Sequence, residues 1–139
     1  MSRITTMLLT SLLAMGAASC GKDDDTITGF RGDVIPGVWT TDFNAKDFND
    51  NKVLEESERQ PIDFATHTYV NDGTGTVVGK INGQQSNYNF QWKLVGNDQA
   101  MLLTTLAGTD SVYIESLSSK SFVVKYMDGD TLRWVGLKR

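Results

Sequence analysis

Apolar and polar residues alternate with a period of two along most of the chain after position 62. In the clearest run, four apolar residues alternate with four polar ones: Tyr88, Phe90, Trp92 and Leu94 with Asn87, Asn89, Gln91 and Lys93. A period of two places alternate side chains on opposite faces of an extended segment, which is typical of a half-buried β-strand. The pattern recurs at 120–127 and, less cleanly, at 131–138.

Short polar turns separate these runs at intervals of about a dozen residues, a spacing typical of an all-β sandwich or barrel. Asn82-Gly83 and Asp128-Gly129 supply the positive φ angles that hairpin turns require. Eight strands joined by short turns favour an all-β fold, an eight-stranded antiparallel up-and-down barrel, because closure removes both exposed sheet edges. The pattern predicts these strands near 37–43, 62–70, 74–82, 86–95, 100–106, 110–117, 120–127 and 131–138.

Composition narrows the class of protein further. The 139 residues are enough for one domain, and 22% charged with 40% apolar residues is ordinary for a globular chain. A net charge of −4 gives no electrostatic basis for binding nucleic acid. A single cysteine, Cys20, excludes an internal disulfide and a cysteine metal cluster.

The position of that cysteine gives it another role. Arg3 is followed by an apolar stretch at 4–18, which is about the length of a signal-peptide core and short for a membrane span. The stretch ends in Ala17-Ala18-Ser19-Cys20 and so resembles a bacterial lipoprotein signal. That resemblance implies that 1–19 are removed and that Cys20 carries the lipid. The alternative is an ordinary signal peptide that contains a cysteine.

The next residues, 20–35, are polar and contain glycine, so we expect a flexible tether that links the lipid to the folded domain. Its acidic run, Asp23-Asp24-Asp25, resembles the surface-export signal of Bacteroidetes-type lipoproteins. The resemblance implies an outer-membrane protein, lipid-anchored and exposed at the cell surface. The alternative is the periplasmic face of the same membrane.

The folded domain is expected at 36–139 and opens with Gly37-Val38-Trp39. Gly-x-Trp at the start of the first strand, with the predicted eight strands, resembles the lipocalin superfamily and especially the small lipocalin-like lipoproteins of Bacteroidetes. In that fold the Trp packs across one end of the barrel, beneath a basic residue near the end of the last strand. The resemblance assigns Trp39 to the first role and Arg133 or Arg139 to the second, because a guanidinium stacks favourably on an indole.

Residues 45–60 interrupt the strand pattern, and in a lipocalin-like barrel such a loop folds over the open mouth as a lid. Its spacing also resembles an EF-hand calcium loop, although that loop requires glycine where Lys52 stands and no helix is expected to precede it. We therefore favour a solvated acidic loop and expect no metal and no cofactor. The residues that match the calcium-loop spacing are Asp47, Asn49, Asn51, Glu55 and Glu58.

The sequence offers little basis for catalysis. The glycine-rich segment 73–79 opens a strand, whereas a phosphate-binding loop must open a helix. His67 is the only histidine and has no predicted partner for metal binding or acid–base chemistry. No Gly-x-Ser-x-Gly motif is present, so we expect a protein that is not an enzyme.

Two functions stay open for such a barrel. An eight-stranded barrel is just wide enough to be filled by side chains or to hold one small ligand. In the first case the protein is a surface interaction module that binds a protein or glycan through its loops or outer face. In the second it carries a small hydrophobic ligand, for which the candidate contacts are Tyr88, Phe90, Trp92 and Trp134.

Overall fold

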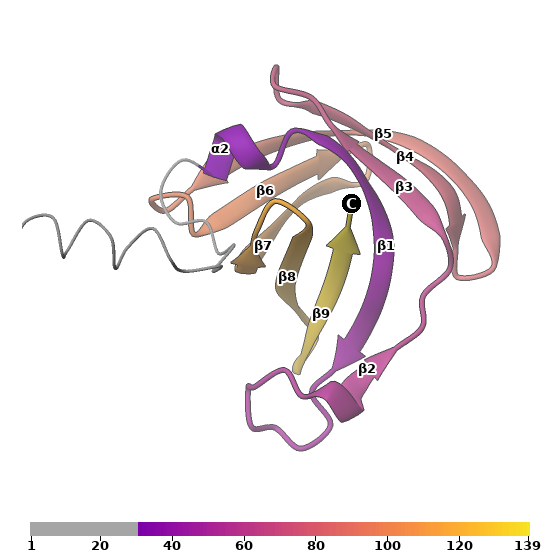
Figure 1. Ribbon diagram of the computed structural model, residues 1–139, viewed down its shortest axis with the longest axis vertical. Coiled ribbons are helices and arrows are strands. Elements are labelled where there is room, and N and C mark those ends of the chain that lie inside the picture. Colours follow the sequence, from indigo (N-terminus) through magenta and orange to yellow (C-terminus); the bar gives the residue numbers. More distant parts are fainter. Residues whose placement is uncertain (1–30) are drawn as a thin grey trace, which may run out of the picture.

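The computed structural model describes residues 31–139, which form an antiparallel β-barrel (Figure 1). The predicted signal peptide at 1–19, the predicted lipid-bearing Cys20 and the first part of the predicted tether lie outside the described residues. The described elements are α2 (Arg31–Val34), β1 (Gly37–Lys46), the 3-10 helix η1 (Glu56–Glu58), β2 (Arg59–Gln60), β3 (Ala65–Tyr69), β4 (Thr74–Ile81), β5 (Gln84–Val95), β6 (Ala100–Thr105), β7 (Gly108–Leu117), β8 (Ser121–Asp128) and β9 (Thr131–Lys138).

Eight of the strands close into a barrel, which confirms the predicted fold. Neighbours in sequence pair from β3 to β9, while β1 pairs with β3 on one side and with β9 on the other. The short β2 pairs only with the end of β1 and lies outside this ring. None of the described helices is long and apolar enough to cross a membrane.

The predicted strand at 62–70 is shorter in the structure, because the ladder between β1 and β3 stops at Thr40. Beyond that point the Thr41 hydroxyl donates to the Asp63 carbonyl and accepts from the Ala65 N–H. One side chain therefore replaces backbone pairing where the chain departs from the sheet.

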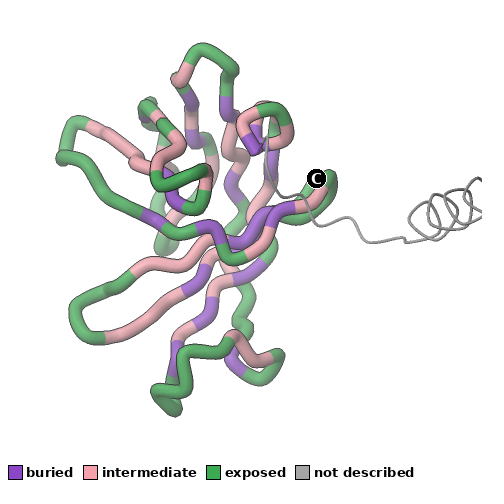
Figure 2. Tube along the Cα trace, turned by 90° about the vertical axis from the view of Figure 1, so that its left-hand side faces the viewer, coloured by how far each residue is buried: buried purple, intermediate pink, exposed green. Residues whose placement is uncertain are grey.

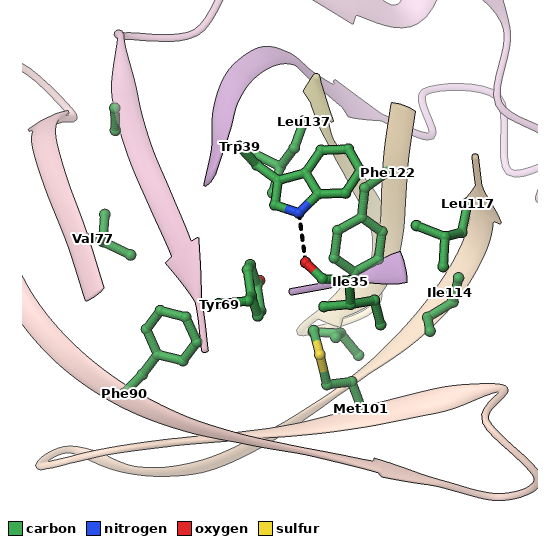
Figure 3. Close-up of a cluster of buried hydrophobic side chains, with 12 residues drawn as sticks. Ile35, Trp39, Tyr69, Val77, Phe90, Met101, Ile114, Leu117, Phe122 and Leu137 are labelled. Atoms are coloured by element: carbon green, nitrogen blue, oxygen red, sulfur yellow. Dashed lines mark hydrogen bonds between the residues drawn. The ribbon is translucent and has the colours of Figure 1, made fainter. Parts of the chain in front are cut away.

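The two ends of the barrel differ. We call the end beside α2 the closed end, because Ile35 lies there, fully buried beneath the ring of Trp39 (Figure 3). The Trp39 indole N–H donates to the Ile35 carbonyl at 2.8 Å, and its ring lies 5.5 Å from the ring of Phe122. The surrounding inner cluster consists of Ile35, Trp39, Ala65, Tyr69, Val77, Phe90, Met101, Val112, Ile114, Leu117, Phe122 and Leu137.

Arg139 covers Trp39 from outside. Its guanidinium carbon lies 3.9 Å from the centroid of the Trp39 ring, and it donates hydrogen bonds to the carbonyls of Val34, Pro36 and Ser119. Gly37 has φ +133°, and a Cβ there would lie 2.8 Å from Arg139 Nη1. The backbone conformation therefore favours glycine, and a larger residue would also displace the Arg139 guanidinium.

The structure therefore selects between the two arginines proposed to cover Trp39. Arg139 takes this position, whereas Arg133 lies near the opposite end and pairs with Asp128 at 2.7 Å. Helix α2 also belongs to the folded domain, because Arg31 is buried and its Nη1 donates to the Asp98 carbonyl. The domain thus includes 31–35, a segment that the sequence placed in the tether.

A second apolar group lies outside the barrel, between the first and last strands. The register of β1 against β9 shifts between Thr41 and Phe43, so Trp39 faces inward whereas Phe43 faces outward over Gly136. This outer cluster consists of Phe43, Ala45, Val123 and Trp134, with Leu54 and Leu132 packed against it. The prediction that Trp134 joins the interior aromatic residues is therefore wrong.

Figure 2 shows buried positions alternating with exposed ones along the strands, and exposed residues at the turns. The alternation follows from the pleat, which sends successive side chains to opposite sides of the barrel wall. The inner and outer clusters are therefore two sides of one sheet at β1, β8 and β9.

Arg139→Lys is expected to lower the free energy of unfolding by about 1–2 kcal/mol. An ammonium keeps the charge but cannot stack as a plane on Trp39 while donating to three carbonyls. Urea denaturation of the two proteins measures the difference. Lys120→Met, which removes a positive charge from the same end, serves as the control and should change stability little; unchanged stability of Arg139→Lys would show that a positive charge alone is sufficient at this position.

Candidate ligand site at the open end of the barrel

We call the end of the barrel opposite α2 the open end, because inward-facing apolar side chains in that half are only partly buried. It is bounded by the turns at 82–83, 106–107 and 129–130 and by the loop between β1 and β2. Several side chains that pack against the inner cluster in this half are only partly buried: Leu103, Val124, Tyr126 and Val135. Solvent therefore reaches apolar side chains inside the barrel from this end.

Strand register identifies the inward-facing wall on the side of β3. His67 pairs with Trp39 on β1 and with Val77 on β4, and both neighbours are buried in the inner cluster. Tyr88 lies opposite Val77 on β5 and is 40% exposed. His67 and Tyr88 thus line the interior above the closed half, and Tyr88 reaches the solvent.

The facing wall is more polar toward the rim. Tyr126 and Lys46 flank Arg133 in the register of β8, β9 and β1, so all three share the inner face of the sheet. The Asp128 carboxylate pairs with the Arg133 guanidinium at 2.7 Å. A molecule in this half would therefore meet apolar side chains below and charged groups at the rim.

The rim also carries exposed apolar residues. Phe64 precedes β3, Leu106 forms part of the β6–β7 turn, and Met127 precedes the β8–β9 turn. They are 67%, 109% and 57% exposed, respectively. An apolar rim suits either the entry of an apolar ligand or contact with a partner.

The predicted lid does not lie across the mouth. In the loop between β1 and β2, Leu54 packs against the outer cluster, while Phe48 and Val53 are exposed. Arg59 places its guanidinium carbon 4.2 Å from the centroid of the Phe43 ring, on the same outer face. Figure 1 shows the loop projecting beyond the ends of β1 and β9. It is attached to the outer wall because its one partly buried apolar side chain is held there.

The acidic residues of this loop are held by hydrogen bonds within the loop. Asp47 accepts from the backbone N–H groups of Asn51 and Lys52, and Glu58 accepts from those of Phe48 and Glu55. Lys52 has φ +62°, the conformation for which a calcium loop uses glycine. Among the described residues, however, no three acidic, histidine or cysteine side chains gather closely enough to hold a metal ion.

Of the four predicted ligand contacts, only Tyr88 lies in the open half. Phe90 is 6% exposed and packs edge-on against Tyr69, with ring centroids 5.1 Å apart. The Trp92 indole N–H donates to the carbonyls of Val70 and Thr74, so this side chain fixes the β3–β4 turn. Trp134 lies in the outer cluster.

The residues that the prediction omitted from the interior site are Leu103, Val124, Tyr126 and Val135. Alternation along 120–127 did place Phe122, Val124 and Tyr126 on one face. Alternation alone could not show which end of the barrel was closed; only the resemblance that placed Trp39 across one end indicated this.

No protein-family model, curated protein or solved structure matches this chain. The likeness to lipocalin-like lipoproteins stays a prediction from sequence motifs. The function is therefore inferred from the geometry of the site and from the residues themselves.

His67 should make stability depend on pH. Burial lowers the pKa of its imidazole below the ordinary value of 6.5, and its cross-strand neighbours Trp39 and Val77 offer no opposite charge. The contribution of neutral His67 to the free energy of unfolding is therefore complete above the unfolded-state pKa. It is lost as the pH falls below that pKa, because the unfolded chain then binds the proton more readily than the folded protein does.

The free energy of unfolding is expected to fall between about pH 7.5 and pH 5.5, and to fall less in His67→Gln. Urea titrations of both proteins across this range measure the two slopes. Parallel slopes would show that other groups cause the dependence.

Proposed function

We propose that this chain is a lipid-anchored barrel protein of the outer cell envelope that carries a small apolar molecule in the open half of its barrel. The observation that carries the ligand proposal is the partial exposure of apolar side chains inside that half. The lipid anchor is inferred from the sequence that ends at Cys20. The proposed role is non-enzymatic and needs no cofactor.

The closed half limits the size and entry of the ligand. Trp39, Met101 and Phe122 are fully buried there, so an eight-stranded barrel has room only above them. A ligand in this position would cover Leu103, Val124 and Val135 and remove their apolar surface from water. Tyr88 and Tyr126 would place hydroxyl groups beside its outer end, which favours a molecule with a polar head.

The lipid anchor would lie on the side of the barrel opposite its open end. The described chain begins with α2, at the closed end. The ten residues between Cys20 and Arg31 reach about 35 Å when fully extended. A barrel held in this way would present its open end away from the lipid, toward the outside of the cell if the acidic run directs surface export.

A second candidate function is a surface interaction module with no internal ligand. The exposed Phe64, Leu106 and Met127 at the rim favour this alternative, because apolar residues at exposed turns often mark contact surfaces. A filled open half would be the expected finding in that case.

Val124→Trp should weaken binding of the fluorescent apolar probe N-phenyl-1-naphthylamine about tenfold, equivalent to about 1.4 kcal/mol, because the larger side chain occupies the open half. Fluorescence titration of a soluble form starting at Gly21 provides the measurement, and native mass spectrometry of the same form detects any ligand that copurifies. Val38→Trp, at an outer position that is 54% exposed, is the matched control.

Tyr126→Trp adds less volume than Val124→Trp and separates occupation of the site from loss of folding. It should weaken binding of the probe without lowering the melting temperature. Wild-type protein that shows no saturable probe binding and no copurified mass would instead favour the interaction module.

Cys20→Ala should move the full-length protein from the membrane fraction to the soluble fraction and abolish incorporation of an alkynyl fatty acid. The reason is that the thiol is the proposed acyl acceptor and supplies the whole of the anchor. Ser19→Ala is the matched control and should keep both properties. Protease treatment of intact cells then distinguishes surface exposure from the periplasmic face. Unchanged fractionation of the Cys20 variant would contradict the anchor.

A further inference from the structure

A separate cleft of about 430 Å³ lies on the outside of the barrel wall. One side is the turn between β3 and β4, and the floor is formed by outward-facing residues of β5 and β6. Its lining consists of Asp72, Gly73, Thr74, Gln91, Trp92, Lys93, Leu102 and Thr104. These residues do not belong to the open half of the barrel.

Strand register arranges the lining in two rows across the sheet. Thr74, Gln91 and Thr104 are direct cross-strand neighbours and form the first row. Lys93 and Leu102 form the next row, two residues farther along the strands and so about 7 Å away. Asp72 stands beyond Thr74 on the turn, which puts the carboxylate and the ammonium toward one side of the cleft and the amide and hydroxyls toward the other.

The turn that forms the wall is held from beneath. The Trp92 backbone N–H donates to the Gly73 carbonyl at 2.9 Å. On the inner face of the same strand, the Trp92 indole N–H reaches the carbonyls of Val70 and Thr74 at 3.0 and 3.1 Å. The position of the wall is therefore set before any ligand arrives, which lowers the entropic cost of binding.

The charged groups of the cleft have unused binding capacity. Asp72 Oδ1 accepts from the Thr74 hydroxyl and N–H, which lowers the pKa of the carboxyl and leaves Oδ2 available. Within the described residues, the side chains of Gln91 and Lys93 form no hydrogen bond and no ion pair, and Asp72 does not pair with Lys93. An ionised acceptor and an ionised donor thus stand unpaired beside one cleft.

We propose that this cleft binds a small zwitterion of the amino-acid or short-peptide class. The ammonium of the ligand would bind the Asp72 carboxylate, and its carboxylate would bind the Lys93 ammonium. The Gln91 amide both donates and accepts, so it matches a peptide group between the two charges. This inference does not depend on whether the barrel interior holds a ligand.

Other ligand classes match the lining less well. An apolar molecule would cover Leu102 but would also desolvate the charges of Asp72 and Lys93 without replacing their water. A simple anion would meet Lys93 but would be repelled by Asp72. A neutral sugar would hydrogen-bond to both groups while leaving both charges uncompensated, so it should bind more weakly than the zwitterion.

The test uses the folded protein, from Gly21 onward, and glycylglycine as the probe, followed through backbone amide NMR shifts at low salt, where exposed charge pairs are least screened. Glycylglycine is expected to shift the amides of Gly73, Thr74 and Lys93 saturably. Asp72→Asn and Lys93→Gln should each weaken it about fivefold, the upper range for an exposed ion pair. Asn retains an acceptor for Thr74, so the turn should be preserved.

Two blocked probes show which charged group of the ligand binds Asp72 and which binds Lys93. N-acetylglycylglycine lacks the ammonium, so Asp72→Asn should no longer affect its binding. Glycylglycine amide lacks the carboxylate, so Lys93→Gln should no longer affect its binding. Lys80→Gln, at an exposed position of β4 outside the cleft, is the control variant and should bind all three probes as the wild type does.

Three results would overturn the proposal. The first is the absence of saturable shifts at the cleft with glycylglycine. The second is equal binding by wild type, Asp72→Asn and Lys93→Gln. The third is that sucrose shifts the same amides as strongly as glycylglycine does, which would show that the cleft binds polar molecules without selecting for charge. Loss of binding in Tyr126→Trp, which alters only the interior, with an unchanged melting temperature would likewise contradict a separate outer site.

Discussion

The closed end of the barrel depends on the Trp39 indole, which contacts Ile35 at its edge and the Arg139 guanidinium on its face. The indole N–H donates to the Ile35 carbonyl in the plane of the ring, and the cation lies over the ring. Because Arg139 also binds the carbonyls of Val34 and Pro36, it ties the last residue of the chain to the segment that enters β1. The same side chain therefore holds together the two strands that close the ring and the residues that close this end of the barrel.

A shift of register in β1 places the apolar residues of this strand in two clusters. Before the shift the strand sends Trp39 inward, and after it the strand sends Phe43 outward. The outer cluster then attaches the acidic loop through Leu54, which leaves the mouth of the barrel uncovered. The register shift in β1 therefore accounts both for the apolar outer cluster that holds the loop and for the uncovered mouth of the barrel.

The strands and their turns were predictable because alternation and Asn-Gly or Asp-Gly pairs are local signals. The position of Trp134 was not, because its face depends on the register that β1 adopts against β9, which is set by tertiary pairing. The role of Ile35 was missed for a similar reason, since four helical residues after a polar segment carry no periodic signal. For the candidate site, the sequence located Tyr88 but not Leu103, Val124 or Val135, because their partial burial depends on how the strands pack.

The bonds that complete the barrel join its beginning to its end. The hydrogen bond from Arg139 to Pro36 spans 103 residues, and that from Thr40 to Lys138 spans 98. A growing chain therefore lacks β9, the second partner of β1, until residues 131–138 have been made, so the ring cannot close before then. Long-range closure of this kind slows folding. Until β9 forms, the edge of β1 that it covers stays unpaired and open to pairing with another chain.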